Sequence, residues 1–178
     1  MVTIIFESHA TSEDNEAKLA SGWADAPLSP VGEDQARALG ERYRGRRFDA
    51  IYCSDLARSY RTGEIGFGAA VRDARLRECN YGRLNRAPVA QIAARQLAAI
   101  TKPFPGGESY QDTARRMRSF LRDLAATRDG QVVLVIGHRA TQYALEHWTR
   151  GASLEAAIAA PWQWQPGWTY ELEHGMVS

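Results

Sequence analysis

Two histidines of the sequence follow apolar, strand-like runs. His9 comes shortly after the run TIIF, and His138 comes directly after the run VVLVIG. A neutral imidazole that is held in place can attack phosphorus, and an unperturbed pKa of about 6.5 leaves much of its population neutral near pH 7. We therefore predict that His9 is the nucleophile of a phosphoryl transfer and that His138 donates a hydrogen bond to the phosphoryl oxygens.

Phosphoryl transfer also needs cations around the phosphoryl oxygens and a proton for the leaving group. Arg58 lies in SDLARSYRT, where Ser54 and Asp55 can cap a helix, and Arg61 lies one turn further along that helix. Glu78, in LRECNYG, can protonate a departing alkoxide when burial or a neighbouring anion raises its pKa. Taken singly, each of these residues is equally compatible with an ordinary ion pair.

Two other chemistries fit the sequence less well. It contains no HExxH pair and no cysteine cluster with zinc-type spacing, so we expect no metal and no other cofactor. Cysteine phosphatases place an arginine six residues after their thiolate, whereas Arg58 comes five residues after Cys53. A thiol inside the strand-like run 48–54 would also be buried and poorly nucleophilic.

The elements that must position these residues are short apolar strands that alternate with helices. Strand-like runs cover residues 2–6, 48–54 and 132–137, a helix is predicted to begin at Ser29-Pro30, and another carries Met117 and Leu124 on one face. This alternation predicts an α/β fold, a three-layer α/β/α sandwich with a mostly parallel central sheet. Ligands bind such sheets at the carboxyl ends of the strands, where the two histidines and Arg58 are expected to meet.

Length and charge limit the organisation and the partners. With 178 residues, the chain is expected to form a single domain, 1–178, with a small lid-like insertion around 83–108. The 22 Lys and Arg balance 21 Asp and Glu, so no global field favours nucleic acid or a membrane surface. Without a leader-like start or a cysteine framework, we expect a cytoplasmic protein that acts on a small phosphorylated metabolite. The oligomeric state stays open.

Three tryptophans crowd the carboxyl-terminal part of the chain. Trp162, Trp164 and Trp168 lie within seven residues. We favour an interpretation in which they pack a last strand, over one in which they stack on a ligand.

Six segments occur in the order found in one known family. They are SHATSEDN, PLSPVGEDQARALG, SDLARSYRT, LRECNYGRLN, PGGES and VLVIGH. With this order, residues 2–145 resemble the histidine phosphatase superfamily, the phosphoglycerate mutase-like proteins. The resemblance implies that His9 becomes transiently phosphorylated, that Arg58 binds the phosphoryl group, that Glu78 is the proton donor and that His138 is the second histidine of the site. It also implies phosphate or substrate contacts at four further positions, Ser12, Asn15, Gly22 and Tyr81.

The sequence departs from the family at its opening motif. Family members usually carry arginine-histidine-glycine, whereas this chain has Ser8-His9-Ala10, so one pocket arginine is absent. Loss of a positioned cation from such a transition state costs about 3–4 kcal/mol, by analogy with an oxyanion donor. We predict that Arg139, which follows the second histidine, or else Arg61, replaces the missing charge. Glu7 is expected to orient the imidazole from a distance or to make an unrelated contact.

The sequence therefore predicts a cofactor-independent phosphomonoester phosphatase with a phosphohistidine intermediate. A phosphoglycerate mutase-type phosphoryl transferase is the nearest alternative, although the chain is shorter than typical mutases. A non-catalytic phosphate-binding relative is the alternative from another class. Retention of His9, Glu78 and His138 together argues against it, because a pure binder needs no proton donor.

Overall fold

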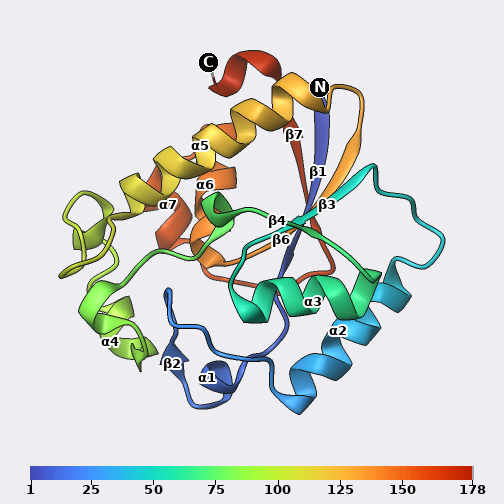
Figure 1. Ribbon diagram of the computed structural model, residues 1–178. Helices are drawn as coiled ribbons and strands as arrows, with labels where there is room; N and C mark the ends of the chain where they lie inside the picture. The colour runs from blue at the N-terminus through green and yellow to red at the C-terminus, as the bar shows by residue number, and fades with distance from the viewer. Residues whose placement is uncertain (178) are drawn as a thin grey trace.

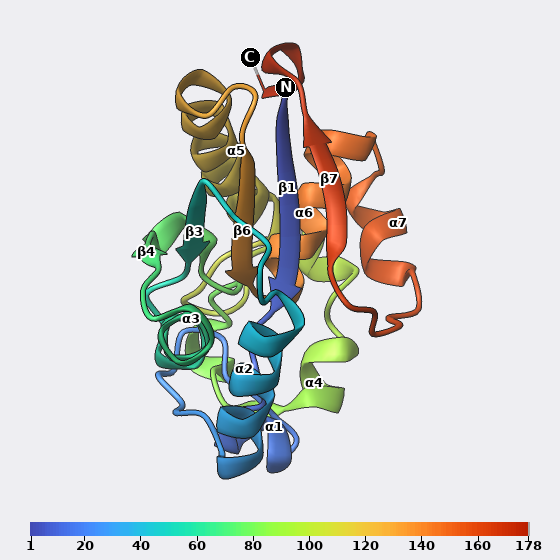
Figure 2. The same ribbon diagram turned by 90° about the vertical axis from the view of Figure 1, so that its right-hand side faces the viewer.

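The computed structural model describes residues 1–177, and its centre is a mixed, mostly parallel sheet of five strands. The strand order is β4-β3-β6-β1-β7, in which β7 runs antiparallel to β1 and the other pairings are parallel (Figure 2). The five strands are β1 (Val2–Ser8), β3 (Ala50–Cys53), β4 (Val71–Arg72), β6 (Val132–Gly137) and β7 (Trp168–Leu172). The predicted α/β fold class is confirmed.

Helices cover both faces of this sheet. Figure 1 shows α5 and α6 on one side of it and α2 and α3 on the other. The helices are α1 (Glu13–Glu16), α2 (Pro30–Arg42), α3 (Ala57–Phe67), α4 (Val89–Ala93), α5 (Tyr110–Thr127), α6 (Arg139–Arg150) and α7 (Leu154–Ala159). The predicted helix start at Ser29 is confirmed, because the Ser29 Oγ accepts a hydrogen bond from the Gly32 N–H (3.2 Å) and Pro30 follows it.

The first strand is apolar on both faces, which explains its unbroken hydrophobic run. Ile4 and Phe6 belong to the core between the sheet and α5 and α6, whereas Ile5 packs in the core under α2 and α3. Because successive side chains of a strand point to opposite faces, a strand between two helical layers needs apolar residues at every position. Glu7 and Ser8, the last two residues of β1, are polar, and so is Thr3 near its start.

The segment 83–108 lies next to that end of the sheet. Within it, β5 (Ala87–Pro88) pairs with β2 (Leu19–Ala20) in a separate two-stranded sheet, and the short helix α4 follows. A 3₁₀ turn, Ala98–Ile100, comes after α4. In Figure 1, α4, β2 and α1 lie together at the end of the molecule opposite the two termini.

The tryptophan cluster divides into two parts. Trp168 lies in β7, is buried and packs against Phe6 with ring centroids 5.9 Å apart, as predicted. Trp162 and Trp164 lie before the strand with 46% and 60% of their surface exposed, so their prediction as packing anchors is wrong. The segment between α7 and β7 loops out from the sheet, which leaves the two indoles at the surface. No helix within residues 1–177 is long and apolar enough to cross a membrane.

Helices α2 and α3 cross at a point where two glycines meet. A Cβ on Gly40 would lie 2.2 Å from the carbonyl oxygen of Gly66, and one on Gly66 would lie 3.0 Å from that of Ala36. The close approach packs α2 tightly against α3, the helix that carries Arg58.

We expect Gly40→Ala to lower the free energy of unfolding by about 1–3 kcal/mol, because the added methyl group forces the two helices apart. Helix propensity alone predicts the opposite sign, a gain of about 1 kcal/mol. Urea denaturation followed by circular dichroism measures the change. Glu41→Ala, at the next and exposed position, is the control and should stay within about 0.5 kcal/mol of the parent. A more stable Gly40→Ala variant would contradict the close crossing.

Candidate active site

A cavity of about 620 Å³ opens at the carboxyl ends of β1, β3 and β6. Eight of the residues selected from the sequence line it: His9, Asn15, Gly22, Arg58, Glu78, Tyr81, His138 and Arg139. Two further candidates among the described residues, Ser12 and Arg61, do not line the cavity. The structure thus brings together residues that are up to 130 positions apart in the sequence, from His9 to Arg139.

The His9 ring is fixed in one tautomer. β1 ends at Ser8, and the His9 N–H donates to the carbonyl of Gly137 (3.0 Å), which ties the residue to β6. Its Nδ1 lies 2.7 Å from the Ala10 carbonyl oxygen, which can only accept, so Nδ1 carries the proton and Nε2 keeps its lone pair. Burial, and secondarily the charge of Arg58, lowers the pKa of His9 from 6.5 to about 3. The ring is therefore neutral at physiological pH.

The second histidine faces the first. The ring centroids of His9 and His138 are 4.9 Å apart, and the His138 Nε2 lies 2.7 Å from the Ser54 hydroxyl. Burial, and then the nearby guanidinium of Arg58, holds the pKa of His138 well below its usual value. Ser54, which the sequence suggested as a helix cap, instead holds this imidazole at the end of β3.

Arg58 is the buried cation of the site. It lies in the first turn of α3 and is only 2% exposed, and its Nη1 and Nη2 donate to the carbonyls of Ala24 (3.1 Å) and Gly22 (2.7 Å). The capping prediction for Ser54 and Asp55 is wrong. The Asp25 carboxylate accepts from the Ala57 N–H (2.6 Å) at the start of α3, so the cap comes from a distant loop.

Arg61 points away from the cavity. Its side chain is 48% exposed and pairs with Glu64 at 2.8 Å, one turn along the same helix. Our prediction that Arg61 can replace the missing motif charge is therefore wrong, because the exposed ion pair with Glu64 holds its guanidinium outside the cavity.

Glu78 combines burial with contacts to backbone N–H groups. Its Oε1 accepts from the N–H of Cys79 (2.8 Å) and from that of Ala140 (3.2 Å) in the first turn of α6. Burial raises the pKa of Glu78 although these hydrogen bonds and the charge of Arg58 act in the opposite direction. Arg77 is not its partner, because that arginine forms an ion pair with Asp55 (2.6 Å).

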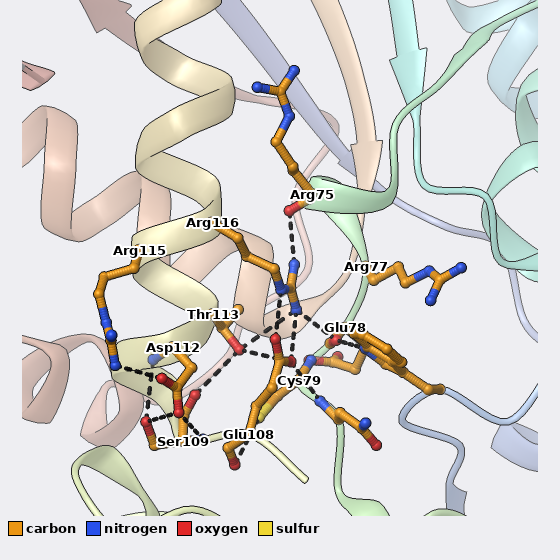
Figure 3. A network of polar contacts seen from close by, with 12 residues as sticks. Arg75, Arg77, Glu78, Cys79, Glu108, Ser109, Asp112, Thr113, Arg115 and Arg116 are labelled. Carbon is orange, nitrogen blue, oxygen red and sulfur yellow. Dashed lines mark hydrogen bonds and ion pairs between the residues drawn. The ribbon is translucent and has the colours of Figure 1, made fainter.

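A network around Arg116 holds the segment that carries Glu78 (Figure 3). The Arg116 guanidinium donates to the backbone carbonyls of Arg75 (2.7 Å) and Glu78 (2.7 Å), and it pairs with Glu108 at 2.9 Å. Glu108 also accepts from the Asn80 N–H (2.9 Å). Sequence periodicity gave no signal for this role, because Arg116 does not belong to the apolar repeat of Met117 and Leu124.

The loops beside Arg58 and Glu78 are joined by one amide. The Asn85 Oδ1 accepts from the N–H groups of Trp23 (3.2 Å) and Tyr81 (3.0 Å). Gly22 has a φ of +55°, and a Cβ there would lie 2.0 Å from this oxygen, so only glycine fits. Gly22 thereby exposes its carbonyl to Arg58 and its backbone to the cavity.

Ser12, Asn15 and Glu7 have roles at the edges of the site. The Ser12 Oγ accepts from the Asn15 N–H (3.2 Å) and caps α1, so Ser12 acts on the cavity through Asn15, which lines it. Glu7 is buried on the side of β1 that faces α2, where its carboxylate accepts hydrogen bonds from Tyr43 (2.7 Å) and Arg42 (3.1 Å). Glu7 thus makes a separate contact and does not orient His9.

A family model and several known proteins match most of this chain. The model of the Histidine phosphatase superfamily (branch 1) matches residues 4–173. A 2,3-bisphosphoglycerate-dependent phosphoglycerate mutase of Cytophaga hutchinsonii is 32% identical over 154 residues, which are 78% of this chain and 72% of the relative. The structure of a mycobacterial glucosyl-3-phosphoglycerate phosphatase in complex with VO3 superposes with a TM-score of 0.77 at 28% identity, over 89% of this chain and 87% of the other. YhfR of Bacillus stearothermophilus shares the fold, with a TM-score of 0.82 at 21% identity and full coverage of both chains.

We expect Arg116→Gln to lower the free energy of unfolding by about 2–4 kcal/mol, because it leaves the half-buried Glu108 carboxylate without its cation and frees two backbone carbonyls. Denaturant unfolding measures the loss. Arg115→Gln, at the adjacent and exposed position of α5, removes only a surface pair with Asp112 and should change stability by at most about 1 kcal/mol. Equal effects of the two substitutions would contradict the supporting role of Arg116.

Proposed function

Because the chain belongs to the histidine phosphatase superfamily, we propose that it is a phosphomonoester phosphatase that acts through a phosphohistidine intermediate on a small phosphorylated metabolite. The observation that carries the proposal is the pairing of a neutral His9, whose Nε2 keeps its lone pair, with a buried Glu78 of raised pKa beside one cavity. A nucleophile and a proton donor of this kind are needed for catalysis and not for binding alone.

In the first step, the His9 Nε2 attacks phosphorus, a P–N bond forms and the P–O bond to the leaving group breaks. The Glu78 carboxyl gives its proton to the departing oxygen, and Arg58 balances the charge of the phosphoryl oxygens. In the second step, water attacks phosphorus while the Glu78 carboxylate takes a proton from it. The P–N bond breaks, inorganic phosphate leaves and the His9 lone pair and the Glu78 proton are restored.

The electrostatics of the site support both roles. A protonated imidazole has no lone pair for attack, so the low pKa of His9 keeps it reactive down to acidic pH. The raised pKa of Glu78 keeps part of its population protonated closer to neutrality than in water. Arg58 makes its hydrogen bonds to neutral carbonyls, which leaves its charge available for an anion.

Ser8 makes the proposed enzyme a slow one. By the family resemblance an arginine is expected there, and the arginines among the described residues that line the cavity are Arg58 and Arg139. Loss of one positioned cation corresponds to a rate about a hundred- to a thousandfold lower. Arg139 stays a predicted substrate-binding residue.

A mutase is the second candidate, because the curated relative from Cytophaga hutchinsonii is named as one. A mutase must retain its product long enough to return the phosphoryl group, whereas a phosphatase admits water to the phosphohistidine. The named phosphatase that superposes on 89% of the chain favours hydrolysis.

We expect His9→Ala to abolish turnover of 4-nitrophenyl phosphate and labelling of the protein by a short pulse of radioactive substrate, because the acceptor nitrogen is gone. The control is His147→Ala, which removes an imidazole that contacts the Ala152 carbonyl (2.8 Å) outside the cavity and should keep both signals. Full activity of His9→Ala would end the proposal. With 3-phosphoglycerate, any product should be free phosphate, and an isomer would favour the mutase.

We expect Glu78→Gln to reduce kcat/KM for phenyl phosphate by about 10²–10⁴-fold, because its leaving group needs a proton. The loss should be far smaller for 4-nitrophenyl phosphate, whose leaving group departs as a stable anion. In the parent, the acid form of Glu78 is the active one, so kcat/KM for phenyl phosphate should fall as pH rises through its raised pKa. That alkaline limb should vanish in Glu78→Gln. Equal losses on both substrates would argue against Glu78 as the proton donor.

A further inference from the structure

Three side chains form a layered group at the exposed part of the cavity, and we call Tyr143, Arg139 and Trp162 the outer stack. The guanidinium carbon of Arg139 lies 5.2 Å from the ring centroid of Tyr143 and 5.4 Å from that of Trp162. Tyr143 and Arg139 come from α6, and Trp162 comes from the segment between α7 and β7. Contact with two aromatic rings limits the motion of the guanidinium.

The charge of Arg139 has no anionic partner in the described structure. None of the ion pairs within residues 1–177 includes Arg139, and its polar contacts go to neutral groups, namely the Gln142 Oε1 (3.5 Å from Nη1) and the Tyr143 side chain. Apart from histidines and tyrosines, the described residues with ionisable side chains that line the cavity are Arg58, Glu78 and Arg139. Arg58 and Glu78 belong to the reacting end, so Arg139 is the charge that a leaving group meets.

The cavity wall has polar groups at Thr11, Asn15, Ser21 and Gln96 and one apolar part. The apolar part is formed by side chains of α4 and α7 together with the indole of Trp162, namely Val89, Ile92, Ala93 and Ile158. The cavity volume of about 620 Å³ falls in the range of roughly 300–1,000 Å³ that holds ligands of drug size. A phosphoryl group fills only part of it. The remaining space suits an apolar body, because hydroxyl groups against these side chains would lose their hydrogen bonds to water.

We propose that the leaving group of the substrate is an apolar acid, a hydrophobic alcohol or phenol that carries a carboxylate, and that Arg139 of the outer stack binds this carboxylate. The inference rests on the proposed phosphatase function. The planar edge of a guanidinium matches the two oxygens of a carboxylate, and the single charge of Arg139 matches a single negative charge. In this arrangement Arg139 recognises the leaving group and does not replace the missing cation at the phosphoryl group.

The experiment compares 4-carboxyphenyl phosphate with 4-carbamoylphenyl phosphate, which has the same shape and no charge. We divide kcat/KM for the carboxylate ester by kcat/KM for the carboxamide ester. We expect this ratio to be about tenfold or more lower in Arg139→Gln than in the parent, because the charge-assisted pair is lost. Arg139→Lys should fall in between, since it keeps the charge without the fork. Comparing ratios between variants cancels the different reactivity of the two leaving groups. The control is Arg150→Gln, at the exposed end of the same helix, which should keep the parent ratio.

Two kinetic outcomes would overturn the inference. Equal losses of kcat/KM on both substrates in Arg139→Gln would assign Arg139 to the phosphoryl group. If the variant loses no kcat/KM on either substrate, Arg139 has no role in recognition. Product binding gives a test that does not depend on turnover. In the presence of phosphate, 4-hydroxybenzoate should raise the Tm of the parent more than 4-hydroxybenzamide does, and Arg139→Gln should lose the difference. A parent that turns over neither phosphate ester but shows this difference would end the phosphatase proposal and keep the carboxylate site. No difference in the parent would end the carboxylate site.

Discussion

The buried guanidinium of Arg58 is the feature on which the candidate site depends. It is 2% exposed and its hydrogen bonds go to the carbonyls of Gly22 and Ala24, which are neutral. A buried cation without a carboxylate partner is costly, so the site is stabilised by an anion that enters the cavity. The same charge disfavours protonation of His9 and His138, and the two rings remain neutral beside it. Affinity for an anion and a reactive imidazole thus have one physical origin.

The fold keeps this arrangement by joining strand ends to loops from elsewhere in the chain. The pairing of β1 with β6 sets His9 against His138, and the backbone of His9 continues that pairing through its bond to Gly137. Ser54 at the end of β3 holds the His138 ring, and Asp25 caps the helix that carries Arg58. Each contact joins residues far apart in sequence, so the geometry of the site depends on the whole fold.

Glu78 lies on an irregular segment and needs other support. Arg116 of α5 holds the Glu78 carbonyl, and Glu108 holds both Arg116 and the Asn80 N–H. The carboxyl of Glu78 itself contacts the first turn of α6. Glu78, the proposed proton donor, is thereby fixed relative to the two histidines, while Arg139 and Trp162 mark the other end of the cavity, where the structure is more exposed.

The sequence by itself determined the three-layer fold, the strand ends that carry His9 and His138, and the family, because apolar runs, helix starts and motif order are local features of the chain. It did not determine which polar residues become buried. No sequence signal marked the inward contacts of Arg116, Ser54 and Asp55 were expected to cap a helix, and Trp162 was expected to pack the last strand. Only the tertiary structure decided these, because periodicity shows which face of an element is polar and not what packs against that face. The contact within the outer stack was likewise decided by the tertiary structure. Arg139 meets Trp162 only because the segment before β7 folds back to the start of α6.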